Sequence, residues 1–321
     1  MAARYLPEDY LYASARVRAL EARMPGAAQL RRWGEAGSVG ELTAALAADG
    51  YTGDVEQILF DSLRTAFDTV RVSLPDPAAV AFLQYPYDVH NIKVYLKAAA
   101  RGVDPLPLSI DLGTVPVAQL GDALEGKEYA LPAVLCEAAA RARAQFEQSK
   151  NPQEIDFVLD RACFTAMRDA AATIPFAADL VAMRADLVNV QMLLRVMRLG
   201  LGEAGRALLL QALVPGGTLE TEFLLAQYEQ DEAALAAALS RTPFAQLWGS
   251  DTSLSALERR ADDLLMARVQ RVKYIPYGAE VPIAYLWGLE SAVRNLRILY
   301  TGLLSGADKG EIAKRVRESY V

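Results

Sequence analysis

The sequence has little of the two residue types on which much enzyme chemistry depends. Among 321 residues there are one histidine, His90, and two cysteines, Cys136 and Cys163. A histidine metal cluster or a histidine-dependent nucleophile relay has only this one candidate, for which we expect a structural or surface role. Two cysteines without C-x-x-C spacing cannot staple a small secreted domain, so we expect core cysteines in a reducing compartment.

Basic charge and long apolar runs are also scarce. The chain carries 33 basic and 40 acidic side chains, for a net charge of -7. A protein that wraps nucleic acid presents a basic face, so we expect no nucleic-acid partner. No uncharged apolar run reaches the roughly 18 residues that a membrane-spanning helix needs, and we expect no signal peptide. The apolar content of 53% is nevertheless enough for a large buried core.

Helix-forming patterns are abundant. Apolar residues recur at three- and four-residue spacing over 55–70 and 186–199, as on one face of an amphipathic helix. Alanine, leucine, arginine and glutamate dominate, and all four favour helices. The alternation typical of strands is absent. The sequence therefore predicts an all-α fold.

Capping and breaker residues place several helix ends. Asn151 stands before a proline, and Ser38 and Ser255 are each followed three residues later by glutamate, which indicates helix starts. Glycine and proline cluster at 102–116 and 200–217. These two stretches are the best candidate boundaries between domains.

The most informative feature is an internal repeat of two elements in the same order. The first is two leucines four positions apart with an aromatic residue nine positions from the first, and we expect its leucines to be core rather than the mouth facing a partner. The second is an asparagine inside an apolar helical stretch, preceded three positions earlier by aspartate in two copies and by alanine in the third. The first element occurs as Leu42-Leu46-Tyr51, Leu120-Leu124-Tyr129 and Leu235-Leu239-Phe244, and the second as Asp88/Asn91, Asp186/Asn189 and Ala292/Asn295.

This order predicts three copies of one helical unit, at residues 1–103, 104–206 and 207–321. Buried polar side chains usually serve a hydrogen bond. We therefore expect the structural repeat positions Asn91, Asn189 and Asn295 to hold neighbouring backbone groups rather than a ligand.

Two motifs with catalytic associations lack their context. The glycines of 200–205 match a dinucleotide fingerprint, but a helical pattern precedes them where a strand is required. Asp262-Asp263 resembles the start of the aspartate-rich motif of isoprenoid synthases, yet Met266 stands where magnesium binding needs another carboxylate. We expect no catalytic residue, cofactor or metal site. The alternatives are a helical enzyme of the isoprenoid-synthase type and an unrelated helical scaffold, whose repeats would be shorter and more uniform.

Several stretches resemble the C subunit of archaeal and bacterial V-type ATPases, which is related to the d subunit of the eukaryotic enzymes. They are Tyr87–Lys93, Glu290–Leu299 and Ile312–Val321, and Tyr10–Arg18 is similar to the opening helix of that family. The resemblance covers nearly the whole chain, and its most specific part is the tail. Ala292 departs from the acidic residue expected at that position.

This resemblance implies three similar helical bundles in a pseudo-threefold, funnel-shaped arrangement. It also implies a non-catalytic rotor subunit that joins the central shaft subunits to the proteolipid ring of the membrane sector and transmits torque for ATP-coupled ion transport. One copy would lie on the cytoplasmic face of the membrane as a peripheral part of the complex. No small-molecule substrate is implied, because ATP is made or hydrolysed in other subunits.

Overall fold

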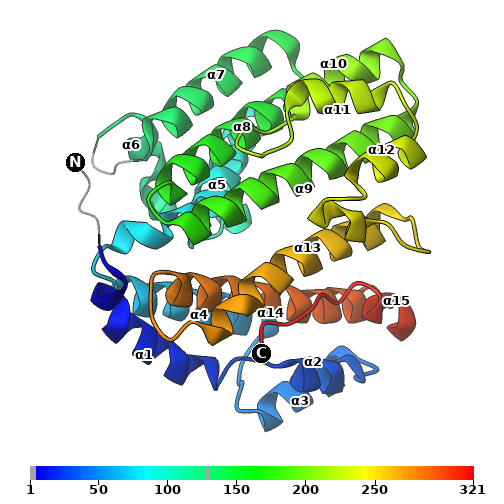
Figure 1. The fold of residues 1–321 in the computed structure, drawn as a ribbon. Helices are drawn as coiled ribbons and strands as arrows, with labels where there is room; N and C mark the ends of the chain where they lie inside the picture. Colours follow the sequence, from blue (N-terminus) through cyan, green and yellow to red (C-terminus); the bar gives the residue numbers. More distant parts are fainter. Residues whose placement is uncertain (1–4, 128–130) are drawn as a thin grey trace. The chain divides into compact units, whose positions relative to one another are not determined.

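A computed structural model describes residues 5–127 and 131–321. Across these two ranges the chain forms helices joined by turns and loops, with no β-strand, so the all-α prediction is confirmed (Figure 1). No helix in the described part of the chain is long and apolar enough to cross a membrane. Tyr129, the aromatic residue of one leucine–leucine–aromatic element, lies outside the described residues.

The chain divides into two compact units. Unit 1 contains residues 1–77 and 236–321, and unit 2 contains residues 78–235. Unit 2 is therefore an insertion between the two segments that build unit 1. This division describes which residues form a compact unit. The predicted repeats at 1–103, 104–206 and 207–321 describe internal similarity of the sequence, so the division does not test them and they stay a prediction.

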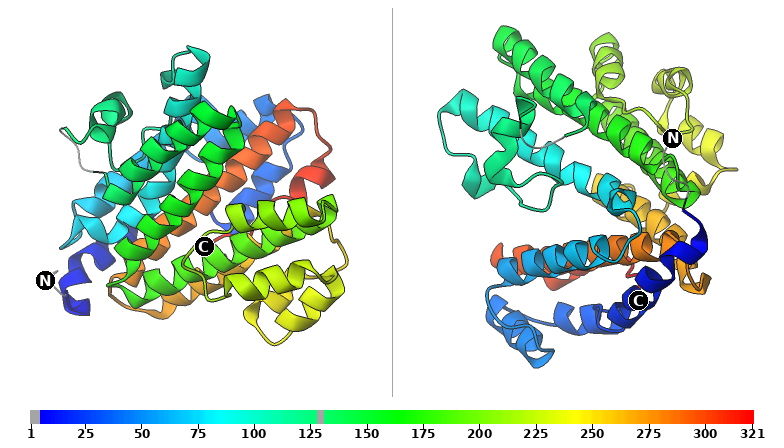
Figure 2. Two further views of the ribbon diagram at one scale, coloured as in Figure 1. Left: turned by 90° about the horizontal axis from the view of Figure 1, so that it is seen from above. Right: turned by 90° about the vertical axis from the view of Figure 1, so that its left-hand side faces the viewer.

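Unit 2 is built around the long helix α8. Helices α5, α7 and α9 pack against α8, and α10 and α11 pack against α9 (Figure 2). The core between them contains Leu135, Leu159 and Leu180, which are inaccessible to solvent. The helices of this unit are α5 (Ala81–Arg101), α6 (Leu120–Leu124), α7 (Ala133–Ser149), α8 (Pro152–Ala171), α9 (Pro175–Leu199), α10 (Glu203–Ala212) and α11 (Thr221–Tyr228), with short 3₁₀ turns at Leu106–Leu108 and Val117–Gln119; another 3₁₀ turn, Pro77–Val80, and α12 (Glu232–Leu239) span its two boundaries with unit 1.

Unit 1 is built around α14. The helices α1, α2, α3, α4, α13 and α15 all contact this central helix, so segments from both parts of the chain share one core. Trp33 and Leu42 are fully buried in it. The elements are α1 (Leu11–Glu21), α2 (Ala27–Gly34), α3 (Val39–Ala48), α4 (Val55–Arg71), α13 (Leu254–Gln270), α14 (Glu280–Leu304) and α15 (Lys309–Ala313), with 3₁₀ turns at Pro7–Tyr10, Pro243–Leu247 and Arg271–Tyr274.

Most of the expected helix ends are where the sequence placed them. The amphipathic stretch 55–70 is α4, and 186–199 is the second part of α9. The side chain of Asn151 accepts a hydrogen bond from the N–H of Gln153 at the start of α8. Ser38 caps α3 in the same way, accepting from the N–H of Glu41.

The start predicted at Ser255 is wrong. The capping residue of α13 is Ser253, whose side chain accepts from the N–H of Ala256. Asp251 accepts a hydrogen bond from the N–H of Ser253 at 2.9 Å. This contact holds Ser253 outside the helix and leaves Ser255 within the first turn.

The leucines of the repeated element belong to the core. Leu42, Leu46, Leu120, Leu235 and Leu239 are buried, and Leu124 is half-buried. Their four-residue spacing is therefore a packing pattern, as expected for the apolar stripe of a helix.

Candidate functional site

The three predicted asparagines lie on the three longest helices of the described chain. These helices are α5, α9 and α14, with 21, 25 and 25 residues. Asn91, Asn189 and Asn295 are 1%, 3% and 0% exposed. An amide buried this deeply needs partners for both its donor and its acceptor.

In unit 2 each asparagine binds one backbone residue of the segment that follows its helix. The Asn91 Nδ2 donates to the carbonyl of Ile110 at 2.8 Å, and the N–H of Ile110 donates back to Oδ1 at 2.8 Å. Asn189 makes the same pair with Val214, at 2.9 and 2.8 Å. The side-chain amide thus satisfies both backbone groups of a residue outside regular structure. We call this paired contact an amide clasp.

The third clasp has the same geometry in unit 1. Asn295 Nδ2 donates to the carbonyl of Arg317 at 3.0 Å, and the N–H of Arg317 donates to Oδ1 at 2.9 Å. In all three cases the residue that is held lies after the end of the helix that holds it. A long helix is therefore tied to the segment returning along its side.

An aspartate strengthens the first two clasps one helical turn before the asparagine. Asp88 accepts from the N–H and the hydroxyl of Thr114, at 2.9 and 2.7 Å, and from the N–H of Val115 at 3.3 Å. Asp186 accepts from the N–H and hydroxyl of Thr218, at 3.0 and 2.7 Å, and from the N–H of the next residue at 2.9 Å. Both returning segments are thereby held at two successive points.

Glycine precedes each of these threonines because the carboxylate lies too close for a side chain. A Cβ on Gly113 would stand 2.1 Å from Oδ1 of Asp88, and a Cβ on Gly217 would stand 2.1 Å from Oδ1 of Asp186. In both segments the glycine follows the clasped residue by three positions and the threonine follows it by four. From the sequence we expect only loop-like stretches here, with no role assigned to the two Gly-Thr pairs.

The aspartate–glycine pair of the first two clasps is absent from the third. A small residue of the helix, Gly288, there faces a large residue of the returning segment, Tyr320. Ala292 stands where the aspartate would be, and Tyr320 stands three positions after the clasped Arg317. Tyr320 is 1% exposed. It lies against Gly288 of α14, where an added Cβ would be 2.5 Å from the Tyr320 Cβ. The third returning segment is thus packed against α14 through Tyr320 and Gly288, without an aspartate–glycine contact.

Asp262 and Asp263, which only resemble the start of the isoprenoid-synthase motif, hold this returning segment. Asp262 pairs with Arg317 at 2.9 Å and with Arg294 at 3.0 Å. Asp263 accepts from the N–H of Glu318 at 2.7 Å. Both carboxylates therefore have structural partners. Gly200, the first glycine of the stretch that matches a dinucleotide fingerprint, follows a helix and not a strand, and it caps the end of α9 with a φ of 63°.

Burial changes the ionisation of several groups at the clasps. It raises the pKa of Asp88 to about 6, against the opposing effect of the hydrogen bonds from Thr114 and Val115. Burial also raises the pKa of Asp263, and together with Glu21 it raises the pKa of Tyr320 to about 12. The Tyr320 hydroxyl donates to Glu21 at 3.0 Å, so it serves as a neutral donor.

The remaining candidates for chemistry lie apart from one another. His90 is exposed, with Nε2 at 3.1 Å from the carbonyl of Leu108. Cys163 is buried, and burial raises the pKa of its thiol to about 12. Outside the undescribed residues 1–4 and 128–130, no three side chains of histidine, cysteine, aspartate or glutamate are grouped to hold a metal ion. The contacts that the described side chains do make at the clasps attach one segment of the chain to another.

These features define a class: an all-helical protein whose three longest described helices each hold a returning segment by an amide clasp. The ATP synthase (C/AC39) subunit family matches residues 13–315, and the chain belongs to this family. It is similar to the C subunit of the V-type sodium ATPase of Enterococcus hirae, with 25% identity over 280 residues that cover 85% of this chain and 84% of that protein. The resemblance found in the sequence is thereby confirmed.

Proposed function

We propose that the chain is the non-catalytic collar of a V-type ATPase or ATP synthase rotor, which joins the central shaft to the proteolipid ring. One copy sits on the cytoplasmic face of the membrane and passes torque between these partners. Membership of the C/AC39 family supports a place in the complex. The name of the Enterococcus hirae relative, the C subunit of a V-type sodium ATPase, agrees with it.

The observation that carries this proposal is the recurrence of the amide clasp on α5, α9 and α14. A collar under torque must keep its long helices from sliding against the segments that connect them. Close-packed interiors transmit strain with little compression. Breaking a clasp would in addition leave two backbone groups without partners, at about 1–3 kcal/mol each when they are buried.

The clasps also fit the predicted repeats. Asn91 ties the first predicted repeat, 1–103, to Ile110 of the second, and Asn189 ties the second, 104–206, to Val214 of the third. Neighbouring repeats are thereby fastened by hydrogen bonds as well as by the peptide chain. The arrangement of three bundles about a pseudo-threefold axis, as a funnel, is part of the same proposal.

The experiment is the purification of the complex from detergent-solubilised membranes with an affinity tag on this chain. We expect ring and shaft subunits to co-purify with one copy of the chain. In its absence the shaft should separate from the ring, and ATP-driven ion transport in reconstituted vesicles should be lost. Full transport in a complex lacking the chain would contradict the collar role.

The helical-enzyme alternative is tested on the isolated chain. A magnesium-dependent diphosphate enzyme needs carboxylates that are free for the metal ions, whereas Asp262 and Asp263 are engaged with Arg317 and Glu318. We expect no turnover of an allylic diphosphate by the wild type. Magnesium-dependent turnover that disappears in Asp262→Asn and Asp263→Asn would favour the enzyme.

A further inference from the structure

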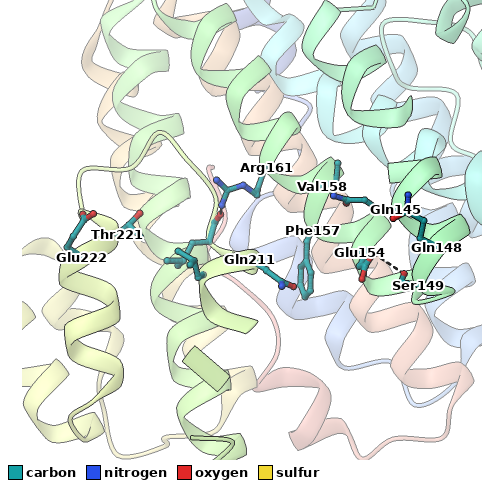
Figure 3. Close-up of a pocket in the computed structure, with 12 residues that line it drawn as sticks. Gln145, Gln148, Ser149, Glu154, Phe157, Val158, Arg161, Gln211, Thr221 and Glu222 are labelled. Atoms are coloured by element: carbon teal, nitrogen blue, oxygen red, sulfur yellow. Dashed lines mark hydrogen bonds between the residues drawn. The ribbon is translucent and has the colours of Figure 1, made fainter. Parts of the chain in front are cut away.

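Unit 2 contains an open groove that the clasps do not use. It has a volume of about 720 Å³ and lies where the end of α7 and the start of α8 face α10 and α11 (Figure 3). Its apolar lining consists of Phe157, Val158, Leu210 and Leu213. Leu210 is 48% exposed, so the groove offers apolar surface that the fold itself leaves uncovered.

The border of the groove is polar and carries more acid than base. It contains glutamines, a serine and a threonine together with the carboxylates of Glu154 and Glu222. Arg161, the one cation among the described residues of the lining, donates from Nη1 to the carbonyl of Leu213 at 2.6 Å. Glu154 accepts from the hydroxyl of Ser149 at 2.9 Å (Figure 3). The described residues of the lining combine apolar side chains with hydrogen-bonding and acidic ones, a composition that suits recognition of another protein segment.

Charge is distributed unequally along the chain in a way that bears on the occupant. Unit 1 has 20 basic and 20 acidic residues, whereas unit 2 has 13 basic and 20 acidic residues, so the whole net charge of -7 belongs to unit 2. Residues 207–240 contain five carboxylates and no basic residue. Glu229 and Glu232 pair with Arg206 and Arg198, and the same stretch supplies Leu210 and Glu222. A basic partner would be attracted to this side of the groove.

We propose that this groove docks a basic amphipathic helix of another subunit of the complex. Apolar side chains at i, i+3 and i+4 of that helix would cover Phe157 and Leu210, and lysine or arginine beside them would pair with Glu154 and Glu222. The charge disfavours two other occupants. Anionic lipid headgroups and a second copy of this chain are both negatively charged, and the acidic unit 2 would repel them. The inference rests on membership of the complex and is independent of the collar role.

The test is site-specific photocrosslinking in the purified complex. A benzophenone amino acid replaces Leu210 in one variant and Leu199 in a control; Leu199 is 56% exposed, belongs to the same unit and does not line the groove. We expect position 210 to crosslink to a basic helical segment of another subunit, identified by mass spectrometry, at least fivefold more than position 199. No crosslink at 210, equal yield at both positions, or a product with lipid, with a second copy or with an acidic or irregular segment would overturn the proposal.

Charge reversal provides the second measurement. Glu222→Lys should reduce the yield of the position-210 crosslink at least fivefold, whereas Glu137→Lys, at an exposed carboxylate on α7 that does not line the groove, should leave it unchanged. Equal effects of the two substitutions would remove the charge argument and refute the basic partner. The crosslink is measured in the complex that contains the chain, and transport is measured in a complex that lacks it. If the crosslink forms and transport nevertheless persists without the chain, the proposed collar role is refuted and the assignment of the groove stands.

Discussion

Replacing Asn189 by aspartate tests the clasp with almost no change of shape. Asn189 is 3% exposed and makes both of its clasp bonds to the backbone of Val214, which is also buried. In Asn189→Asp the acceptor of the Val214 N–H is retained. The donor to the Val214 carbonyl is replaced by a carboxylate oxygen, so that two acceptors face each other at the position of a 2.9 Å hydrogen bond.

The expected cost follows from two contributions. The Val214 carbonyl loses its partner while buried, which costs about 1–3 kcal/mol. Neither clasp bond offers the new carboxylate a cation, and a buried charge without one adds on the order of 2–3 kcal/mol. We expect the free energy of unfolding to fall by about 3–6 kcal/mol at neutral pH. For a unit of this size, each kcal/mol lowers the melting temperature by about 2–4 °C.

Scanning calorimetry of the full chain is the assay, with Asn151→Asp as the matched control. Asn151 is exposed and caps α8, where aspartate is as good a cap as asparagine. We expect a drop of at least about 6 °C for Asn189→Asp and almost none for Asn151→Asp. If both variants melt within about 2 °C of the wild type, the clasp does not stabilise unit 2 and the mechanical argument built on it fails.

Three further outcomes follow from the same contacts. Gly217→Ala should destabilise unit 2, because the added Cβ would stand 2.1 Å from the Asp186 carboxylate. The control Gly40→Ala, in the open first turn of α3, should be neutral or stabilise by up to about 1 kcal/mol. Urea unfolding curves measure both variants, and equal effects would contradict the close approach at Gly217. Gly288→Ala should displace Tyr320 and reduce the stability of unit 1 by about 1–3 kcal/mol, and an unchanged unfolding midpoint would show that Tyr320 moves freely. Burial raises the pKa of Asp88 to about 6 in the fold, so protonated Asp88 adds to the free energy of unfolding below about pH 4. This contribution is lost as the pH rises through about 6, and the loss is on the order of 3 kcal/mol relative to Asp88→Asn. If the free energy of unfolding of the two proteins changed with pH in parallel, the raised pKa would be refuted.

The helices and the asparagines could be predicted because their signals are local. The apolar spacing of 55–70 defines α4 within one residue, and the Asn151-Pro152 pair defines the start of α8. Asn91, Asn189 and Asn295 stood out because an amide is unusual in an apolar helical stretch. That they mark equivalent positions of three repeats stays our interpretation.

What each asparagine holds could not be predicted, because the partner lies 19 to 25 residues away in loops of different length. The Gly-Thr pairs at 113–114 and 217–218 were a usable signal, since they follow the clasped residue at equal spacing. Tyr320 could not be matched to them. In the first two clasps the glycine is on the returning segment, whereas here the returning segment carries the large Tyr320 and the glycine, Gly288, is on the helix. The Ser255 prediction failed for a similar reason, since Asp251 and Ser253 offered a competing cap two residues earlier.

The insertion of unit 2 between the two segments of unit 1 has a consequence for synthesis of the protein. Helices α1–α4 are synthesised before the rest of the described helices, but α14, against which they pack, begins at Glu280 and follows only after the 202 residues 78–279 have been made. At about 5–20 residues per second this interval lasts roughly 10–40 s. During that time Leu59, Leu63 and Phe67 of α4 lack their final cover, while the inserted unit can already complete its own core. The nascent chain thus matures from its middle outwards, and its earliest helices are the ones that most need protection from aggregation.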